Sequence, residues 1–172
     1  MTVMDKTILT AALLSTMTLA GCVNEKRHGG DALPPGAAMP GFSVSGPDAA
    51  VSSDDLAGAP SVVVFFRTTC PDCSREMPNV EEAFRRVAGS GVRFVCVSKE
   101  DDAAVVVPEY WARTGMTMPY YYDPAGGMFT AFGVRFVPTL YLFDSEGKVA
   151  WAAVETFGFT VDELVGRIEG LR

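Results

Sequence analysis

Histidine is almost absent from this sequence, which has one, His28, among 172 residues. A structural zinc site takes four ligands, mostly from cysteine and histidine. His28 lies in a segment rich in glycine, proline and charged residues, away from the cysteines at positions 70, 73 and 96. We therefore expect neither a metal site nor a cofactor.

Basic residues are also scarce. Fourteen Lys and Arg stand against 21 Asp and Glu, which gives a formal net charge of -7. No basic stripe is visible, so binding to nucleic acid is disfavoured. An acidic surface would also be repelled by anionic lipid headgroups. The sequence shows no internal repeat, and we expect the chain to be a monomer.

Long apolar runs are missing as well. The uncharged run at residues 8–20 is too short for a transmembrane helix, which takes about 20 residues, but it fits the apolar region of a signal peptide. It ends in Leu19-Ala20-Gly21-Cys22, which resembles the lipobox of bacterial lipoproteins. That resemblance implies cleavage before Cys22 and a lipid on its sulfur. The alternative is an ordinary signal peptide followed by an unrelated cysteine.

These features divide the chain into three parts. Residues 1–21 are expected to be a lipoprotein signal peptide, and residues 22–40 a lipidated cysteine followed by a flexible tether rich in Gly and Pro. Residues 41–172 are long enough for one compact domain with its own core. Such a protein would be anchored in the cell envelope and face the periplasm or the outside, where disulfides can persist.

The domain is expected to be of the α/β class. Residues 61–66 (SVVVFF) form a continuous apolar run, typical of a strand buried on both faces. A helix over residues 74–88, interrupted by Pro78, and a strand over 92–98 complete a parallel β–α–β unit. A further helix is expected within 101–114, at least from Pro108, at a first-turn position, through Trp111. Others are expected at 127–132 and at 160–171, where Thr160 and Glu163 form a capping-box pattern. Further expected strands are 120–122, 139–143 and 148–153, with one or two edge strands in 41–56. The result is a mixed central sheet flanked by helices, with an N-terminal β-hairpin.

The segment Thr68-Thr69-Cys70-Pro71-Asp72-Cys73 carries the chemistry. Two cysteines two residues apart can be a redox pair, part of a metal site or a structural disulfide. A disulfide across so short a loop restricts the unfolded chain little, and ligands for a metal are lacking, so a redox pair is favoured. Cys96 lies within an apolar strand, where a small buried side chain is a better interpretation than a third redox thiol.

A Cys-x-x-Cys motif between a buried strand and a helix resembles the thioredoxin fold. Residues 70–78 (CPDCSREMP) are similar to the CxxCxxExP run of the TlpA-like family, which includes reductases of cytochrome c maturation. Residues 136–139 (FVPT) stand where this fold carries its cis-proline loop. Residues 100–123 stand where the family inserts an extra helix and strand. The resemblance implies an anchored or secreted thiol-disulfide oxidoreductase.

The resemblance also implies roles for single residues. Cys70 would attack a disulfide of a protein substrate, and Cys73 would resolve the mixed disulfide. Glu76 would exchange a proton with Cys73, although a solvated helix residue is the alternative. Val137 would offer its backbone to an extended substrate segment, and Pro138, if cis, would fix that loop. A reductase of this kind would need a membrane protein that supplies electrons.

The residues around the cysteines indicate the direction of electron flow. Cys70 at a helix N-terminus should have a stabilised thiolate, and Arg67 could add positive charge. Asp72 opposes this stabilisation, and Val64 stands where thioredoxin has a buried carboxylate, just as Thr69 replaces the usual tryptophan. A less stabilised thiolate makes a better electron donor, so we expect a reductase. The alternatives are an oxidase or isomerase on the same fold, or a non-catalytic binding lipoprotein.

Overall fold

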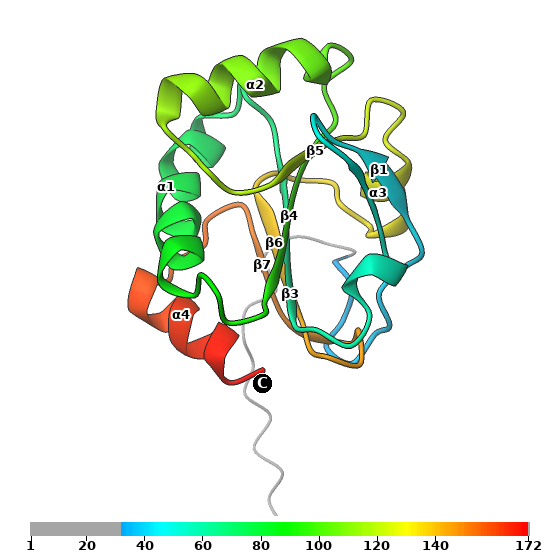
Figure 1. Ribbon diagram of the computed structural model, residues 1–172, viewed down its shortest axis with the longest axis vertical. Helices are drawn as coiled ribbons and strands as arrows, with labels where there is room; N and C mark the ends of the chain where they lie inside the picture. Colours follow the sequence, from blue (N-terminus) through cyan, green and yellow to red (C-terminus); the bar gives the residue numbers. More distant parts are fainter. Residues whose placement is uncertain (1–31, 172) are drawn as a thin grey trace, which may run out of the picture.

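The computed structural model describes residues 32–171. The expected signal peptide, Cys22 and the first part of the expected tether lie outside this range. Within it, the chain forms one seven-stranded mixed sheet with the order β2-β1-β5-β4-β3-β6-β7 (Figure 1). The strands are β1 (Ser43–Ser45), β2 (Ala50–Ser52), β3 (Ser61–Phe66), β4 (Arg93–Ser98), β5 (Tyr120–Tyr122), β6 (Thr139–Phe143) and β7 (Val149–Val154).

Helices cover both faces of this sheet (Figure 1). They are α1 (Pro71–Arg86), α2 (Ala103–Thr114), α3 (Gly127–Ala131), α4 (Val161–Glu169) and the 3-10 helix η1 (Asp54–Leu56). Buried side chains of α1, α2 and α4 share one core cluster, whereas those of α3 and η1 belong to a second cluster on the opposite face. The expected α/β class, mixed sheet and N-terminal hairpin are confirmed.

Strand β3 forms the centre of the sheet because every one of its residues is apolar or small. It runs parallel to β4 and antiparallel to β6. Side chains alternate between the faces of a strand, so Val62 and Val64 enter the first cluster while Val63 and Phe65 enter the second. This two-sided burial places the end of β3, and the cysteines that follow it, at a fixed point of the molecule.

Most helix boundaries differ from the expected ones by one to three residues. Helix α1 begins at Pro71, because Cys70 is its N-cap and a proline suits the first helical position. Helix α2 begins at Ala103, so Pro108 lies inside it and not in its first turn. The buried residues Ala103 and Val107 extend this helix toward its N-terminus. The expected capping box of Thr160 with Glu163 is present in α4.

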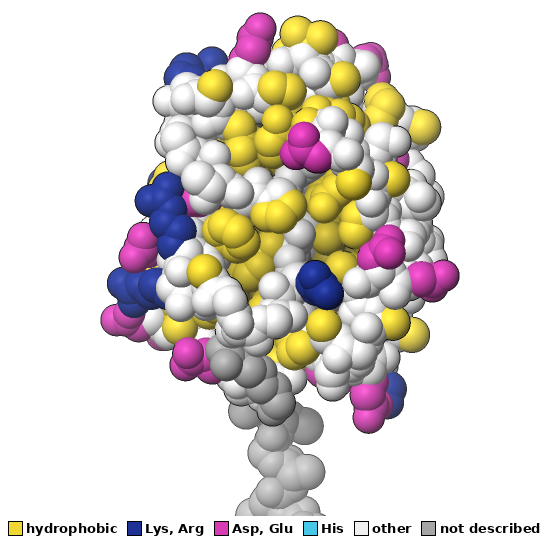
Figure 2. Space-filling view, in the orientation of Figure 1, with side chains coloured by type: hydrophobic (Ala, Val, Ile, Leu, Met, Phe, Trp, Pro, Cys, Tyr) yellow, Lys and Arg dark blue, Asp and Glu magenta, His cyan; other side chains and the backbone are white. Residues whose placement is uncertain are grey.

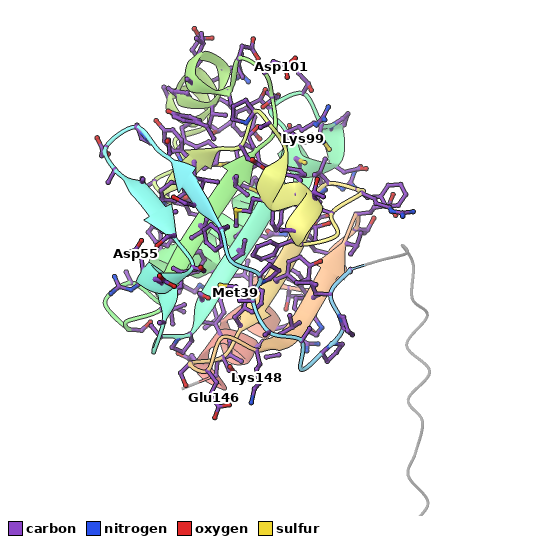
Figure 3. The ribbon with its side chains drawn as sticks, turned by 90° about the vertical axis from the view of Figure 1, so that its right-hand side faces the viewer. Met39, Asp55, Lys99, Asp101, Glu146 and Lys148 are labelled. Carbon is purple, nitrogen blue, oxygen red and sulfur yellow. The ribbon has the colours of Figure 1, made fainter. Side chains whose placement is uncertain are left out.

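The expected tether ends earlier than residue 40. The Gly36 amide donates to the Val149 carbonyl and the Met39 amide to the Gly147 carbonyl, both at 2.7 Å. The Leu33 amide donates to the Tyr141 hydroxyl at 3.1 Å. This segment pairs with β7 because that strand otherwise has an open edge; Met39 lies near the β6–β7 turn that carries Glu146 and Lys148 (Figure 3). The folded domain therefore includes residues that the sequence assigned to the tether.

No helix between residues 32 and 171 combines the length and the apolar character needed to cross a membrane.

Candidate active site

Both cysteines of the CxxC motif lie at the N-terminus of α1. Cys70 caps the helix and is half-buried, while Cys73, in the first turn, is completely buried. Both are free thiols. The Cys73 amide donates to the Cys70 sulfur at 3.3 Å. Because backbone N–H groups at a helix N-terminus point outward without helical partners, this sulfur receives a donor that would stabilise a thiolate.

The loop before β6 meets this sulfur from the other side. The Cys70 thiol donates to the Val137 carbonyl at 3.5 Å, and the peptide bond between Val137 and Pro138 is cis. Val137 is half-buried and Pro138 is buried. The structure thus brings together Cys70, Val137 and Pro138, which the sequence analysis assigned to one site.

The environment of Cys73 suppresses its thiolate. Burial is the main reason that the pKa of Cys73 is raised well above its ordinary value, and a hydrogen bond with Cys70 and the negative charge of Asp72 act in the same direction. A backbone hydrogen bond from Arg67 opposes them. Val64, completely buried in the same cluster, adds an apolar surface and no charge. Cys73 therefore needs a base before it can act as a nucleophile.

Glu76 is a buried carboxylate on the same helix. It lies three residues after Cys73, so the two share a helix face. Only 7% of Glu76 is exposed, which rules out the alternative of a solvated helix residue. Its Oε1 accepts a hydrogen bond from Arg75 Nε at 3.4 Å.

Arg75 is a residue that the sequence analysis did not single out. Besides contacting Glu76, it forms an ion pair with Asp72 at 2.8 Å. Acidic and basic side chains alternate along the left-hand side of the molecule in Figure 2, where α1 lies. Two further ion pairs within α1 are Arg85–Glu81 and Arg86–Glu82. The spacing of three residues between Asp72 and Arg75 was the available signal. Arg75 offsets part of the negative charge that Asp72 places beside the cysteines.

Arg67 contributes through its backbone. Its side chain is exposed, while its carbonyl accepts a hydrogen bond from the Cys70 amide at 3.3 Å. Together with the backbone hydrogen bond to Cys73, this contact makes the turn between β3 and α1 a part of the site.

Glu100 was also missed by the sequence analysis. It follows β4 and accepts hydrogen bonds from Thr68, in the turn that leads to Cys70. Because β3 and β4 are parallel, the segments that follow them meet at one edge of the sheet. The polar residues directly after both apolar strands were the signal that could have found this contact.

Cys96 stands apart from the pair. It is completely buried in β4, and its thiol donates to the sulfur of Met118 at 3.8 Å. Burial raises its pKa well above the ordinary value for a thiol. These observations favour the interpretation of Cys96 as a small core residue.

Two large apolar side chains remain exposed among the described residues. Phe136, directly before Val137, is 45% exposed, and Val105 on α2 is 60% exposed. Figure 2 shows further hydrophobic side chains gathered over the middle of the face that it views. Phe136 extends the loop beside Cys70 with an apolar surface.

Solved structures share this fold. A thiol:disulfide interchange protein of the thioredoxin family from Chlorobium tepidum TLS superimposes with a TM-score of 0.67 at 25% identity, over 81% of this chain and 97% of the other. A DsbF homologue from Corynebacterium diphtheriae gives a TM-score of 0.69 at 21% identity, over 79% and 87%. The expected thioredoxin-like fold is confirmed.

Sequence relatives agree with the structural ones. The thiol-disulfide oxidoreductase ResA of Halalkalibacterium halodurans is 29% identical over 106 residues, which cover 62% of this chain and 58% of the relative. ResA of Geobacillus thermodenitrificans is 28% identical over 118 residues, or 69% and 66%. The matched part thus spans roughly three-fifths of the length of these relatives. The sequence model of the Redoxin family matches residues 34–166, which include the CxxC motif and the Val137–Pro138 loop, and the chain belongs to that family.

Proposed function

We propose that this protein is a thiol-disulfide oxidoreductase of the cell envelope that reduces disulfides in protein substrates. The observation that carries the proposal is the arrangement of the two thiols. Cys70 is accessible at the N-terminus of α1 beside the Val137 carbonyl, and Cys73 is buried behind it. An accessible nucleophile with a second thiol within reach is what disulfide exchange through a mixed disulfide requires.

In the first step the Cys70 thiolate attacks one sulfur of the substrate disulfide. A bond forms between Cys70 and that sulfur, the substrate S–S bond breaks, and the other substrate sulfur leaves as a thiolate that takes up a proton. The Cys73 amide, which donates to the Cys70 sulfur, supports the attacking thiolate. Cys73 is too deeply buried to meet a protein substrate itself.

In the second step Cys73 resolves the mixed disulfide. Glu76 accepts the Cys73 proton, the Cys73 sulfur bonds to that of Cys70, and the second substrate sulfur leaves as a thiol. The substrate has gained two electrons and the enzyme holds a Cys70–Cys73 disulfide. A further dithiol must reduce this disulfide before the next cycle, and we assign that role to an electron-donating membrane protein.

The substrate segment is proposed to bind along the loop at Val137. An extended peptide can use main-chain hydrogen bonds there, as one strand pairs with another. The adjacent Phe136 side chain, 45% exposed, offers an apolar contact at the same place. Main-chain recognition would suit substrates that are unfolded around their cysteines.

Reduction is favoured over oxidation by the surroundings of the dithiol. Asp72 and burial both disfavour a thiolate at Cys73, and the completely buried Val64 adds apolar surface and no charge. A reduced form that is not strongly stabilised gives electrons away readily. The two relatives named above are called ResA, and their name gives the activity class without the direction.

The reduction potential, which indicates the direction of electron flow, can be measured by equilibrium with glutathione. We expect a reduction potential below about -200 mV, in the range of reducing thioredoxin-like proteins. A higher value would identify an oxidase or isomerase. Cys70→Ser should abolish reduction of a protein disulfide such as insulin. If that variant keeps its full biological effect, the catalytic function is excluded and the alternative of a non-catalytic binding protein remains.

The anchor is proposed from the sequence alone. Cys22 is expected to carry the lipid, so the protein would face the periplasm or the outside. Cys22→Ser should release the protein from the membrane fraction. Retention of this variant in the membrane would contradict the lipobox assignment. Capture of mixed disulfides on Cys73→Ser would then identify the substrates.

A further inference from the structure

The carboxylate of Glu100, outside the CxxC motif, holds the turn that leads into the motif. Oε1 of Glu100 accepts the Thr68 amide at 3.0 Å and the Thr68 hydroxyl at 2.5 Å. Oε2 accepts the Ser98 hydroxyl at 2.6 Å. Ser98 is completely buried, and both Glu100 and Thr68 are half-buried. Figure 3 labels Lys99 and Asp101, which flank Glu100 just after β4.

The Thr68 amide belongs to a peptide plane whose carbonyl group, that of Arg67, accepts a hydrogen bond from the Cys70 amide. A peptide unit is rigid, so its N–H and C=O groups turn together. In the unit that joins Arg67 to Thr68, the N–H donates to Glu100 and the C=O accepts from the Cys70 amide at 3.3 Å. Holding one end of this plane therefore orients the hydrogen bond that Cys70 makes with the other.

The same turn also reaches the second cysteine. The Arg67 N–H, in the peptide unit just before that plane, acts on Cys73 and opposes the rise in its pKa that burial causes. Residue 67 thus contacts both cysteines, and its carbonyl, which meets Cys70, lies on the plane that Glu100 fixes from β4. Cys73 is already held from the opposite side by burial in the core, so the turn is the adjustable element of the pair.

Two other buried carboxylates show what a purely structural role looks like. Glu81 accepts hydrogen bonds from the loop at Thr117 and Met118. Asp123 accepts the amides of Gly127 and Phe129. Neither of them accepts a hydrogen bond from the turn before Cys70. Glu100 differs because its donors stand two residues before Cys70.

We propose that Glu100 is a positioning residue for the dithiol, holding the Arg67–Thr68 peptide so that Cys73 can attack Cys70 in a mixed disulfide. This role rests on the proposed function of the pair. In the step concerned, the Cys73 sulfur bonds to the Cys70 sulfur, the bond from Cys70 to the substrate breaks, and the electron pair leaves with the substrate sulfur, which takes up a proton. Glu100 touches neither sulfur and exchanges no proton in this step.

Reaction with 5,5′-dithiobis(2-nitrobenzoate) separates the two steps. Attack by Cys70 releases a first equivalent of the coloured thiolate, and attack by Cys73 on the mixed disulfide releases the second. We expect Glu100→Ala to slow the second release about tenfold, as loss of hydrogen bonds to a charged group would. The first release should change less than about twofold, because the helix amide that supports Cys70 remains in place.

Conservative variants test whether the acceptor matters. Glu100→Gln keeps an oxygen that can accept the Thr68 amide, so it should restore most of the second rate. Thr68→Val removes the hydroxyl and keeps the amide and the shape, so it should slow that rate about threefold, because only one of the two hydrogen bonds from Thr68 to the carboxylate is lost. If Glu100→Ala does not fold, Thr68→Val decides the question. Glu109→Ala, exposed on α2, is the matched control and should behave as the wild type.

Two results would overturn the assignment. Variants that lose thermal stability but keep the wild-type second rate, or that slow both releases equally, would show that Glu100 only supports the fold. A wild-type protein that releases one equivalent or none would refute the dithiol function, and the role of Glu100 with it. A normal wild type with unaffected variants refutes the role of Glu100 alone.

Discussion

The Cys70 sulfur lies 3.5 Å from the carbonyl oxygen of Val137, although 67 positions separate the two residues. This contact joins the N-terminus of α1 to the loop that precedes β6. In the proposed reaction, a substrate disulfide that reaches Cys70 would therefore pass along the loop formed by Phe136, Val137 and Pro138. The chemistry of the loop side chains should then affect which substrates react.

Phe136→Ser tests the apolar contact. Loss of a half-exposed phenylalanine should lower kcat/KM for a peptide disulfide with apolar flanking residues by about fivefold, from the apolar area that such a side chain can bury. The rate with oxidised glutathione, which is small and charged, should not change. Val105→Ser removes another exposed apolar side chain and serves as the control. Equal losses with both substrates would show that Phe136 does not set specificity.

Glu76→Gln tests the proposed base. The pKa of Cys73 is raised, mainly by burial, so its attack on the mixed disulfide should depend strongly on a proton acceptor. Without the carboxylate we expect the second release from 5,5′-dithiobis(2-nitrobenzoate) to slow by about 10²-fold at neutral pH. The loss should shrink as the pH rises, because hydroxide can then remove the proton. Glu82→Gln, on the same helix but half-exposed, is the control, and an unchanged pH profile in Glu76→Gln would exclude the role.

Asp72→Asn tests the electrostatic argument for reduction. Asp72 lies in the first turn of α1, whose N-cap is Cys70, so its negative charge opposes the positive end of the helix dipole there, and its removal should favour a thiolate at the helix N-terminus and stabilise the reduced form. The reduction potential should therefore become less negative, by about 10–20 mV, or a few-fold in the equilibrium with glutathione. The change is small because Asp72 is half-exposed and already paired with Arg75. Asp54→Asn, far along the chain in η1, should leave the potential unchanged, and a more negative potential in Asp72→Asn would contradict the argument.

Glu81→Gln should destabilise the protein in a pH-dependent way. Burial alone would raise the pKa of Glu81, but hydrogen bonds from Thr117, Met118 and Arg85 outweigh it and lower the pKa below the ordinary value. A lowered folded pKa stabilises the protein above about pH 4.3, the ordinary glutamate value, and this contribution is lost as the pH falls through the folded value.

Urea unfolding at two pH values measures the effect. We expect Glu81→Gln to lower the free energy of unfolding by about 1–3 kcal/mol at pH 7 and by much less near pH 3. Glu82→Gln should cost little at either pH, because its ion pair with Arg86 is half-exposed. A loss that is the same at both pH values would mean that the charge of Glu81 contributes nothing.

Local patterns made the fold predictable. The run at residues 61–66 is apolar throughout, which identified the central strand, and Thr160 with Glu163 identified the start of α4. The CxxC motif and the Val137–Pro138 loop could be paired in advance because the family resemblance placed them together. Arg75 and Glu100 belong to no comparable motif. Their positions in the sequence, three residues after Asp72 and directly after an apolar strand, indicate where contacts could form, but which contacts form depends on side-chain geometry.

The start of the domain could not be predicted for a related reason. Residues 33–39 contain two prolines and a glycine and lack an apolar period, which is typical of a linker. Their order comes from a tertiary contact, the open edge of β7, which accepts their backbone hydrogen bonds. Composition indicates how a segment behaves in isolation. It does not indicate that an edge strand elsewhere in the fold, here β7, has free backbone groups with which the segment can pair.

Truncation tests how much this segment contributes. A chain that begins at residue 41 loses the hydrogen bonds from Gly36 to Val149, from Val149 to Ala37 and from Met39 to Gly147. At about 1 kcal/mol each, their loss should lower the midpoint of thermal unfolding by about 5–10 °C relative to a chain that begins at residue 32. The bared edge of β7 should also promote self-association, because an unpaired strand edge can pair with another chain. Equal midpoints for the two chains in thermal unfolding, together with equal sedimentation, would show that the segment only rests on the surface.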